Sequence, residues 1–236
     1  MAIIGLIPAR GGSKGIPGKN IALCAGRPLL AHTAVAALNA KLLDRVILST
    51  DDAAIASVGK EWGLDVPFVR PTELASDTAS SLSVIAHALK WAQCGGAHVD
   101  AIVLLQPTSP LRGARQIDEA VALLLDSGAD TVVSVMEVPH RFHPQSLMHI
   151  EESTLHPLIE GGELVLRRQD LPTLYARNGP AILAIRPAQI ATGHFYSGNT
   201  VPYVMPSIDS LDVDTPEDLE VADAIISHRL SKADRL

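Results

Sequence analysis

Three cationic residues lie close together in a glycine-rich segment near the beginning of this 236-residue chain. Arg10, Lys14 and Lys19 share the stretch from Pro8 to Asn20 with four glycines, and this stretch contains no acidic residue. Glycine lets the backbone approach a ligand closely and turn several N–H groups toward one concavity, where an anion is held. The segment therefore predicts a phosphate-binding loop. The alternative is a flexible surface loop, but a position directly after a predicted strand favours ligand binding.

The spacing of these residues differs from two common phosphate-binding motifs. A Walker A loop has a glycine five positions before its second glycine and Ser or Thr after its lysine, whereas Ser13 and Asn20 occupy those positions here. The pattern G-x-G-x-x-G of dinucleotide-binding folds is also absent. The chain shows no Ser-His-Asp or Cys-His nucleophile, and its nine histidines lack the spacing of a zinc site.

Two carboxylates near the other end of the chain have the spacing of a metal site. Asp212 and Asp214 are two residues apart, so on a strand both would face the same way, as a magnesium site requires. The alternative is a pair of capping acids before the last helix, but Thr215 already suits the N-cap, which favours the metal. Residues 1–43 contain no acid and residues 207–220 contain no base. One end of the chain is therefore suited to anions and the other to a cation.

Alternating strands and helices must position these residues. Apolar runs predict strands over 2–7, 46–48, 66–69, 101–105, 131–135, 181–185 and 201–205. Helical periodicity and caps predict helices over 28–38, 53–62, 78–93, 114–125 and 216–230. This rhythm is typical of a single α/β domain with an open, mostly parallel sheet and helices on both faces.

The predicted loops of interest all follow the carboxyl ends of strands, where open parallel sheets bind ligands. They cover 8–20, 49–52, 70–78 and 106–112, and we expect them to meet in one crevice. The rhythm breaks over 137–176, which is rich in Pro, His and Arg and too long for a bare loop. We interpret 137–176 as an arm that leaves the core and buries its apolar residues against a second copy of the chain.

Composition excludes several classes of function. A net charge of −7 and an aromatic content of 3% argue against binding to nucleic acid. No apolar run reaches the roughly 18 residues that span a bilayer, and we see no signal peptide, so no membrane partner is expected. Cys24 and Cys94 are too few for a disulfide framework, which favours the reducing cytoplasm.

Six segments in the same order resemble the acylneuraminate cytidylyltransferases, also called CMP-sialic acid synthetases, and together they span nearly the whole chain. They are I-P-A-R-G-G-S-K-G-I-P-G-K-N-I at 7–21, R-P-x-E-L-A-S-D-T at 70–78, L-Q-P-T-S-P-L-R at 105–112, R-Q-D-L-P at 168–172, N-G at 178–179 and S-L-D-V-D-T at 210–215.

The resemblance implies a Rossmann-like fold of the nucleotide-diphospho-sugar transferase type and a homodimer formed through the arm. It implies that CMP is transferred from CTP to the anomeric hydroxyl of a nonulosonic acid, with release of pyrophosphate and with Mg²⁺ as cofactor. Neither the residues nor the resemblance names the acid among sialic, legionaminic, pseudaminic and deaminated relatives. The alternatives are a cytidylyltransferase for 3-deoxy-manno-octulosonate (Kdo) and a non-catalytic nucleotide-binding subunit of the same fold.

The resemblance also assigns roles to individual residues. Lys19 would lie near the reacting α-phosphate, where an ammonium stabilises developing charge, and the alternative is a solvated surface lysine. Arg10 and Asp214 join it as catalytic residues, and Asp212 and Asp214 would hold the metal. The general base stays open between Asp214 and a water on the metal. The residues expected to contact the nucleotide are Ala9, Arg10, Gly11, Gly12, Ser13, Lys14, Lys19, Asn20, Arg70 and Ser80.

On the sugar side the resemblance implicates Gln106, Arg168, Arg177 and Asn178. Arg168 would reach the partner subunit's site and meet the sugar carboxylate, to which a guanidinium binds bidentately. A turn residue is the alternative for Gln106, a surface arginine for Arg168, and a helix-start residue for Ser80. The chain departs from the family where a lysine often follows His-Pro in the arm. It departs again where Arg-Pro often precedes Asn-Gly, and we expect Arg177 to substitute there.

Overall fold

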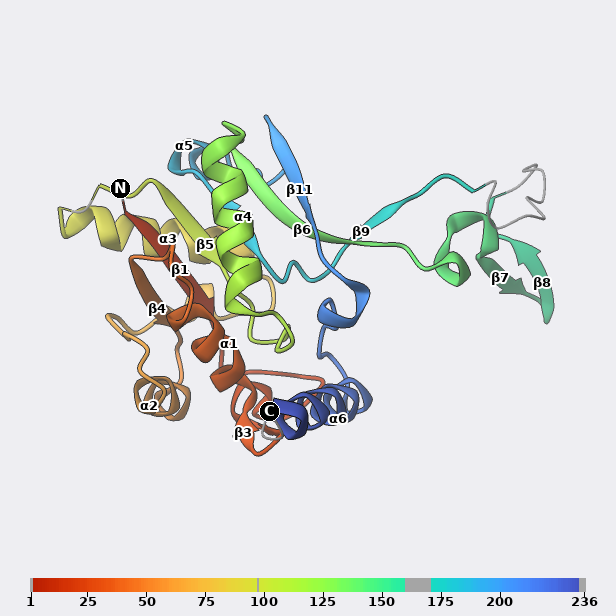
Figure 1. Cartoon of the computed structure of the whole chain (residues 1–236), viewed down its shortest axis with the longest axis horizontal. Helices are drawn as coiled ribbons and strands as arrows, with labels where there is room; N and C mark the ends of the chain where they lie inside the picture. Colours follow the sequence, from red (N-terminus) through yellow and green to blue (C-terminus); the bar gives the residue numbers. More distant parts are fainter. Residues whose placement is uncertain (1, 97, 160–170, 234–236) are drawn as a thin grey trace.

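A seven-stranded sheet runs through the body of the molecule, with helices on both of its faces (Figure 1). The computed structural model describes residues 2–96, 98–159 and 171–233. The strands lie in the order β11-β6-β10-β5-β1-β4, and β9 pairs with the far end of β6. Their bounds are β1 (Ile3–Pro8), β4 (Arg45–Ser49), β5 (Ala101–Leu104), β6 (Thr131–Glu137), β9 (Tyr175–Arg177), β10 (Leu183–Ile185) and β11 (Thr200–Val204).

The mostly parallel sheet that the sequence predicts is confirmed. Strand β1 pairs in parallel with β4 and β5, and β11 pairs in parallel with β6. Strand β10 is antiparallel to both β5 and β6 and closes the gap between them. The helices are α1 (Leu29–Leu38), α2 (Ala53–Glu61), α3 (Ser81–Cys94), α4 (Ala114–Asp126), α5 (Pro187–Ala191) and α6 (Pro216–Ala233).

The core forms on both faces of this sheet because side chains alternate along each strand. In β1, Ile3 and Ile7 pack with residues of α1 and α4. Ile4 and Leu6 face the other way and pack with residues of α3 and α5. Strands that are buried on both faces have continuous apolar sequences. For this reason most of the strands could be predicted from the sequence.

The strand predicted over 66–69 is wrong. This stretch makes only single bridges to β4, between Ile47 and Asp65 and between Thr50 and Val69. Pro67 has no backbone N–H to donate to a ladder, so a central strand cannot continue through it. The Val69 side chain is 78% exposed, although its apolar character suggested burial. The stretch instead carries the chain from α2 toward the loop at 70–80.

Strands β9 and β10 run along the same side of β6, and the chain bulges outward between them at 178–182. Asn178 holds this bulge from inside the protein, where it is 4% exposed. Its side-chain oxygen accepts from the Ser134 hydroxyl (2.6 Å), and its NH₂ group donates to the Ser210 hydroxyl (3.0 Å). Gly179 has a φ of +110°, a conformation that favours glycine.

The last helix begins as the sequence predicts. The Thr215 hydroxyl accepts from the Asp218 N–H (3.2 Å), and the Asp218 carboxylate accepts from the Thr215 N–H (2.8 Å). This reciprocal cap fixes the entry of α6. The preceding segment has no strand pairing, so the two-residue spacing of Asp212 and Asp214 does not lie on a strand. It is held instead by the Val213 N–H, which donates to the Thr108 carbonyl (2.8 Å).

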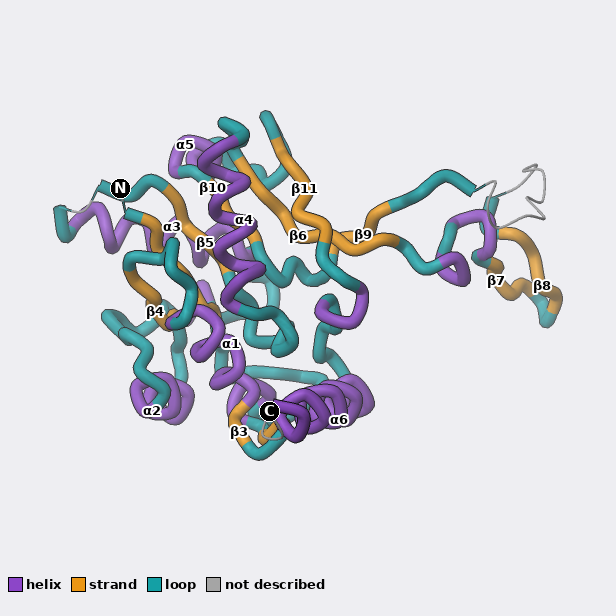
Figure 2. The backbone as a smooth tube through the Cα atoms, in the orientation of Figure 1, coloured by secondary structure: helices purple, strands orange, loops and turns teal. Residues whose placement is uncertain are grey.

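The segment that follows β6 leaves the body and returns through β9 (Figure 1). Figure 2 shows short helical turns in this excursion, followed by a small hairpin of β7 (Met148–Glu151) and β8 (Thr154–Pro157) near its tip. Apolar side chains on it are exposed, including Ile150 at 76% and Leu155 at 59%. Within the described residues no helix is long and apolar enough to cross a membrane.

Candidate active site

The loops that follow β1 and β5 meet in a cavity of about 530 Å³ at the carboxyl ends of the parallel strands. The segment after β4 at 70–84, the turn at Gly179 and the carboxylates of Asp212 and Asp214 complete its wall. Three of the four loops expected to converge, 8–20, 70–78 and 106–112, therefore line one cavity, whereas no residue of 49–52 is part of its lining. Of the residues predicted to bind ligand, the cavity is lined by Arg10, Ser13, Lys14, Lys19, Asn20, Arg70, Gln106, Asp212 and Asp214.

Backbone and side-chain hydrogen bonds hold the glycine-rich loop in place. The Ala9 N–H donates to the Ser49 carbonyl at the end of β4 (2.9 Å), and the buried Asn20 amide donates to the Arg10 carbonyl (3.0 Å). A side chain at Gly11 would collide with the Asp52 carboxylate, and one at Gly15 with the Asp214 carbonyl oxygen. These two glycines are therefore required by close packing, while Ala9 and Asn20 support the loop.

Two cations of the loop share one carboxylate, which the sequence analysis did not single out. Arg10 contacts one oxygen of Asp77 at 2.9 Å, and Lys14 contacts the other at 2.5 Å. The hydrogen bond from Lys14, together with the nearby positive charges, holds the pKa of Asp77 below its usual range. Asp77 lines the cavity and belongs to the segment 70–78, which the sequence predicted to be one of the ligand-binding loops. An acid in a motif beside a cationic loop was the only sequence signal for this pairing.

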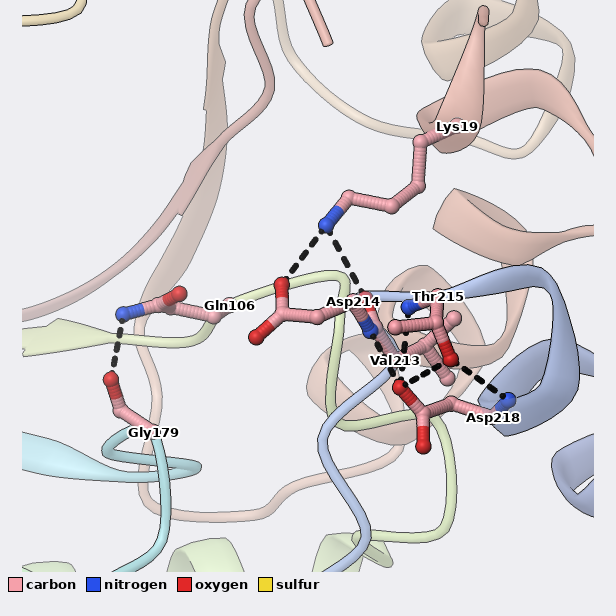
Figure 3. A network of polar contacts seen from close by, with 7 residues as sticks. All are labelled: Lys19, Gln106, Gly179, Val213, Asp214, Thr215 and Asp218. Atoms are coloured by element: carbon pink, nitrogen blue, oxygen red, sulfur yellow. Dashed lines mark hydrogen bonds and ion pairs between the residues drawn. The ribbon is translucent and has the colours of Figure 1, made fainter. Parts of the chain in front are cut away.

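Lys19 reaches across the cavity to the C-terminal segment (Figure 3). Its ammonium donates to the Val213 carbonyl (2.9 Å) and to the Asp214 carboxylate (3.0 Å). The Lys19 side chain is only 15% exposed, whereas that of Asp214 is 70% exposed. The sequence alternative of a solvated surface lysine therefore does not describe Lys19.

Asp212 lies deeper than Asp214. Burial, with a smaller contribution from the Asp214 charge, raises the pKa of Asp212, while the nearby Thr108 hydroxyl and the charge of Lys19 oppose the rise. Its Oδ1 atom is buried and has no hydrogen-bond partner among the described residues. A carboxylate oxygen that is buried without a donor is costly unless a cation meets it.

Arg70 and Ser80 differ in their relation to the cavity. The Arg70 side chain is buried, donates to the hydroxyl (3.0 Å) and the carbonyl of Ser49, and still lines the cavity. Burial lowers its pKa to about 10. The Ser80 hydroxyl accepts from the Ser83 N–H (3.1 Å) at the N-cap of α3 and is not among the lining residues, whereas Ala79 and Ser81 are.

The structure separates the residues that were expected to contact the sugar acid. The Gln106 side chain donates to the Gly179 carbonyl (3.0 Å) at the cavity wall (Figure 3). The side-chain amide of Asn178 forms its hydrogen bonds inside the protein, so Asn178 supports the Gly179 turn from the interior. Arg177 is exposed on β9, donates to the Tyr196 hydroxyl (3.0 Å), and lies outside the cavity lining. Arg168 lies outside the described residues.

The fold and the cavity together define an α/β protein whose cavity, at the carboxyl ends of the parallel strands, has the charges that suit a phosphorylated ligand. Cations of the first loop form one side of the cavity, and a carboxylate pair from the C-terminal segment forms the other.

Comparison with known proteins identifies the family. A family model described as cytidylyltransferase matches residues 4–229. The chain is 36% identical to a CMP-N,N'-diacetyllegionaminic acid synthase of Legionella pneumophila, covering 96% of this chain and 97% of that protein. It is 30% identical to a pseudaminic acid cytidylyltransferase of Campylobacter jejuni, covering 92% and 93%. The chain belongs to the cytidylyltransferase family and is a nucleotidyltransferase, as its resemblance to the acylneuraminate enzymes predicted.

Two further comparisons concern length and fold. An N-acylneuraminate cytidylyltransferase of Escherichia coli is 33% identical over 93% of this chain, which spans 51% of that longer protein. A solved structure of CMP:2-keto-3-deoxy-manno-octonic acid synthetase in complex with CTP matches 97% of this chain and all of that chain, with a TM-score of 0.70. At 16% identity this likeness shows the fold.

The pairing of Asp77 with the loop cations leads to a prediction. A polyanion that binds Arg10 and Lys14 must displace the Asp77 carboxylate, so Asp77→Asn should bind inorganic pyrophosphate roughly three- to tenfold more tightly, the scale of losing weak exposed ion pairs. Titration calorimetry measures this affinity. Asp65→Asn is the matched control, because Asp65 pairs with Arg45 away from the cavity. Equal affinity of the wild type and Asp77→Asn would show that Asp77 does not compete with the anion.

Proposed function

We propose that the protein transfers CMP from CTP to the anomeric hydroxyl of a nonulosonic acid. The observation that carries this proposal is the meeting of the Lys19 ammonium with the Asp212–Asp214 segment across one cavity, beside the cationic loop. This arrangement offers donors for a triphosphate and carboxylates for a cation at the same place. Relatives named as cytidylyltransferases and synthases for legionaminic, pseudaminic and acylneuraminic acids support the choice of reaction.

In this reaction the hydroxyl oxygen of the sugar acid attacks the α-phosphorus of CTP. The bond from that phosphorus to the oxygen that bridges to the β-phosphate breaks, and pyrophosphate leaves. Arg10 and Lys14 would bind the phosphates, and Lys19 would stabilise the charge that develops at the α-phosphate. Positioning and charge neutralisation account for most catalysis of phosphoryl transfer. Asp214 lines the cavity and is our candidate to accept the hydroxyl proton.

Asp212 and Asp214 would hold Mg²⁺. The partnerless, buried Oδ1 atom of Asp212 and the raised pKa of this group fit a carboxylate that is completed by a cation. When bound, the ion would neutralise negative charge on the phosphates. Because folding raises the pKa of Asp212, its ionised form destabilises the metal-free protein at neutral pH. This destabilisation disappears as the pH falls below the pKa that Asp212 has in the unfolded chain.

A coupled assay of pyrophosphate release tests the function. CTP would be incubated with each acid of a panel (sialic, legionaminic, pseudaminic, deaminated and Kdo) with Mg²⁺ or with EDTA. We expect release with at least one nonulosonic acid and none with EDTA. Turnover with Kdo alone would replace the proposal with the Kdo activity. Absence of turnover with every acid would refute it.

The position of Lys19 gives a kinetic prediction. If its ammonium stabilises charge in the transition state, Lys19→Ala should lower kcat by roughly 10²–10³-fold, the effect of removing one preorganised donor. Steady-state kinetics with CTP and the best acid measure this loss, with Lys41→Ala as a control on an exposed lysine. A rise in KM alone would limit Lys19 to binding the ground state.

The metal proposal gives a prediction with two independent measurements. Asp212→Asn should reduce CMP transfer at least about 10²-fold, while the Tm of the metal-free variant at neutral pH should equal or exceed that of the wild type. Mg²⁺ should raise the Tm of the wild type but not of the variant. Asp209→Asn is the control, since Asp209 pairs with Arg229 and does not line the cavity. Activity in EDTA would contradict the metal assignment.

We further propose that the excursion over 137–176 is the dimerisation arm. Its exposed apolar residues support this, because Met148, Ile150, Leu155 and Leu158 need a covering surface. A second copy of the chain related by a two-fold axis supplies one. Leu164 and Leu166, which are further apolar residues of this excursion, lie outside the described residues.

Sedimentation at assay concentration tests the arm. We expect a dimer for the wild type and a shift to monomer for Ile150→Asp, because a charge at the centre of an apolar contact must be desolvated. Leu23→Asp is the control, since Leu23 is 68% exposed on the separate strand β2 (Leu23–Cys24). A monomeric wild type would refute the proposed dimer.

A further inference from the structure

A guanidinium is buried directly behind the acceptor side of the cavity. Arg112 lies between β5 and α4 and is 2% exposed. Its Nη1 atom donates to the carbonyls of Ala181 (2.6 Å) and Gln106 (3.2 Å), and its Nη2 atom donates to the Thr33 hydroxyl (2.7 Å). Among the ion pairs of the described residues, none involves Arg112.

Burying a cation without a carboxylate partner is costly, and burial lowers the pKa of Arg112 to about 9. The Nε atom also lacks a hydrogen-bond partner among the described residues. An apolar side chain could fill the same volume at a lower desolvation cost. The fold therefore keeps a guanidinium at a place where its directed hydrogen bonds, and not its volume alone, are needed.

The carbonyls that Arg112 binds lie on both sides of one contact at the cavity wall. The Gln106 side chain donates to the Gly179 carbonyl (3.0 Å), as Figure 3 shows. Arg112 holds the backbone of Gln106 itself, and it holds Ala181, two residues beyond Gly179. The guanidinium thus fixes the distance between Gln106 and the Gly179 turn, which the Gln106 side chain contacts. Both Gln106 and Gly179 line the cavity, whereas Arg112 does not.

The loop that Arg112 ends also positions the carboxylates. Within this loop, the Ser109 N–H donates to the Gln106 carbonyl (3.3 Å), the same oxygen that Arg112 binds. The Thr108 carbonyl accepts from the N–H of Val213, which lies between the two aspartates (2.8 Å). A movement of the loop would therefore displace Gln106 and the Asp212–Asp214 segment together.

We propose that Arg112 is a positioning residue for the sugar acid: it holds Gln106 and the Gly179 turn in the arrangement that the acceptor requires. This inference rests on the proposed function. Lysine cannot replace it, because a single ammonium at the end of a flexible stem does not reproduce the planar fork that spans three acceptors.

The test compares Arg112→Lys with Arg186→Lys. Arg186 also donates to two backbone carbonyls, those of Ala129 (2.8 Å) and Leu124 (2.9 Å). It follows the antiparallel strand β10, however, and so lies at the ends of the strands that are opposite to the cavity. We expect Arg112→Lys to raise the KM for the acid roughly tenfold or more and the KM for CTP by a smaller factor, because Gln106 and the Gly179 turn lose their positions directly, whereas the Asp212–Asp214 segment is reached only through Thr108. Arg186→Lys should change neither KM. Equal increases in both KM values, or the same effect from Arg186→Lys, would reduce Arg112 to a structural residue.

Hydrogen exchange supplies a readout that does not depend on turnover. In Arg112→Lys the amides of Ala181, Ile182 and Val213 should exchange faster than in the wild type, and in Arg186→Lys they should not. Unchanged exchange at these amides would overturn the proposal. If Arg112→Lys does not fold, Arg112→Met, which keeps most of the buried volume, takes its place. If the wild type transfers CMP to no acid, the proposed function fails, while exchange still decides whether Arg112 fixes this wall.

Discussion

The contact between Lys19 and the Val213–Asp214 segment joins the two ends of the chain. The residues are separated by almost the whole sequence, yet the ammonium bonds a backbone carbonyl and a carboxylate of the same short segment. The contact is possible because β1 delivers the glycine-rich loop to the carboxyl edge of the sheet. Gly15 then permits the segment to pass within van der Waals contact of the loop. The rest of the cavity is arranged around this junction.

Charge balance stabilises the three cations of the glycine-rich loop. Asp77 faces Arg10 and Lys14, and Asp214 faces Lys19. The carboxylates of these pairs are well exposed, and ion pairs between exposed side chains are weak. They offset part of the positive charge of the loop and can yield to a polyanion with several charges. Asp212 differs, because it is half-buried beside Asp214 and its buried Oδ1 atom has no hydrogen-bond partner among the described residues.

The two sides of the cavity come from different parts of the fold. The side proposed to bind phosphate is built by local structure at the ends of β1 and β4, where hydrogen bonds hold a loop of 13 residues, 8–20. The side proposed to bind the acceptor depends on the bulge between β9 and β10, which Asn178 supports from within and which Arg112 ties to the loop after β5. The bulge directly follows the excursion, so this second side is also where the excursion returns to the body.

The sequence by itself determined most strands and helices, the phosphate loop and the carboxylate pair. These features are written in local patterns: apolar runs, caps such as Thr215 with Asp218, and cations among glycines. The exception at 66–69 has a local cause as well, since Pro67 cannot donate to a ladder.

Only the tertiary structure decided which side chains meet. It paired Asp77 with Arg10 and Lys14, turned Asn178 inward although its motif suggested a ligand contact, and buried Arg112 behind Gln106. It also set the antiparallel direction of β10, since an apolar run has the same composition in either direction. The physical reason is that a polar side chain selects its partner by distance and desolvation. Both depend on segments that lie far away along the chain.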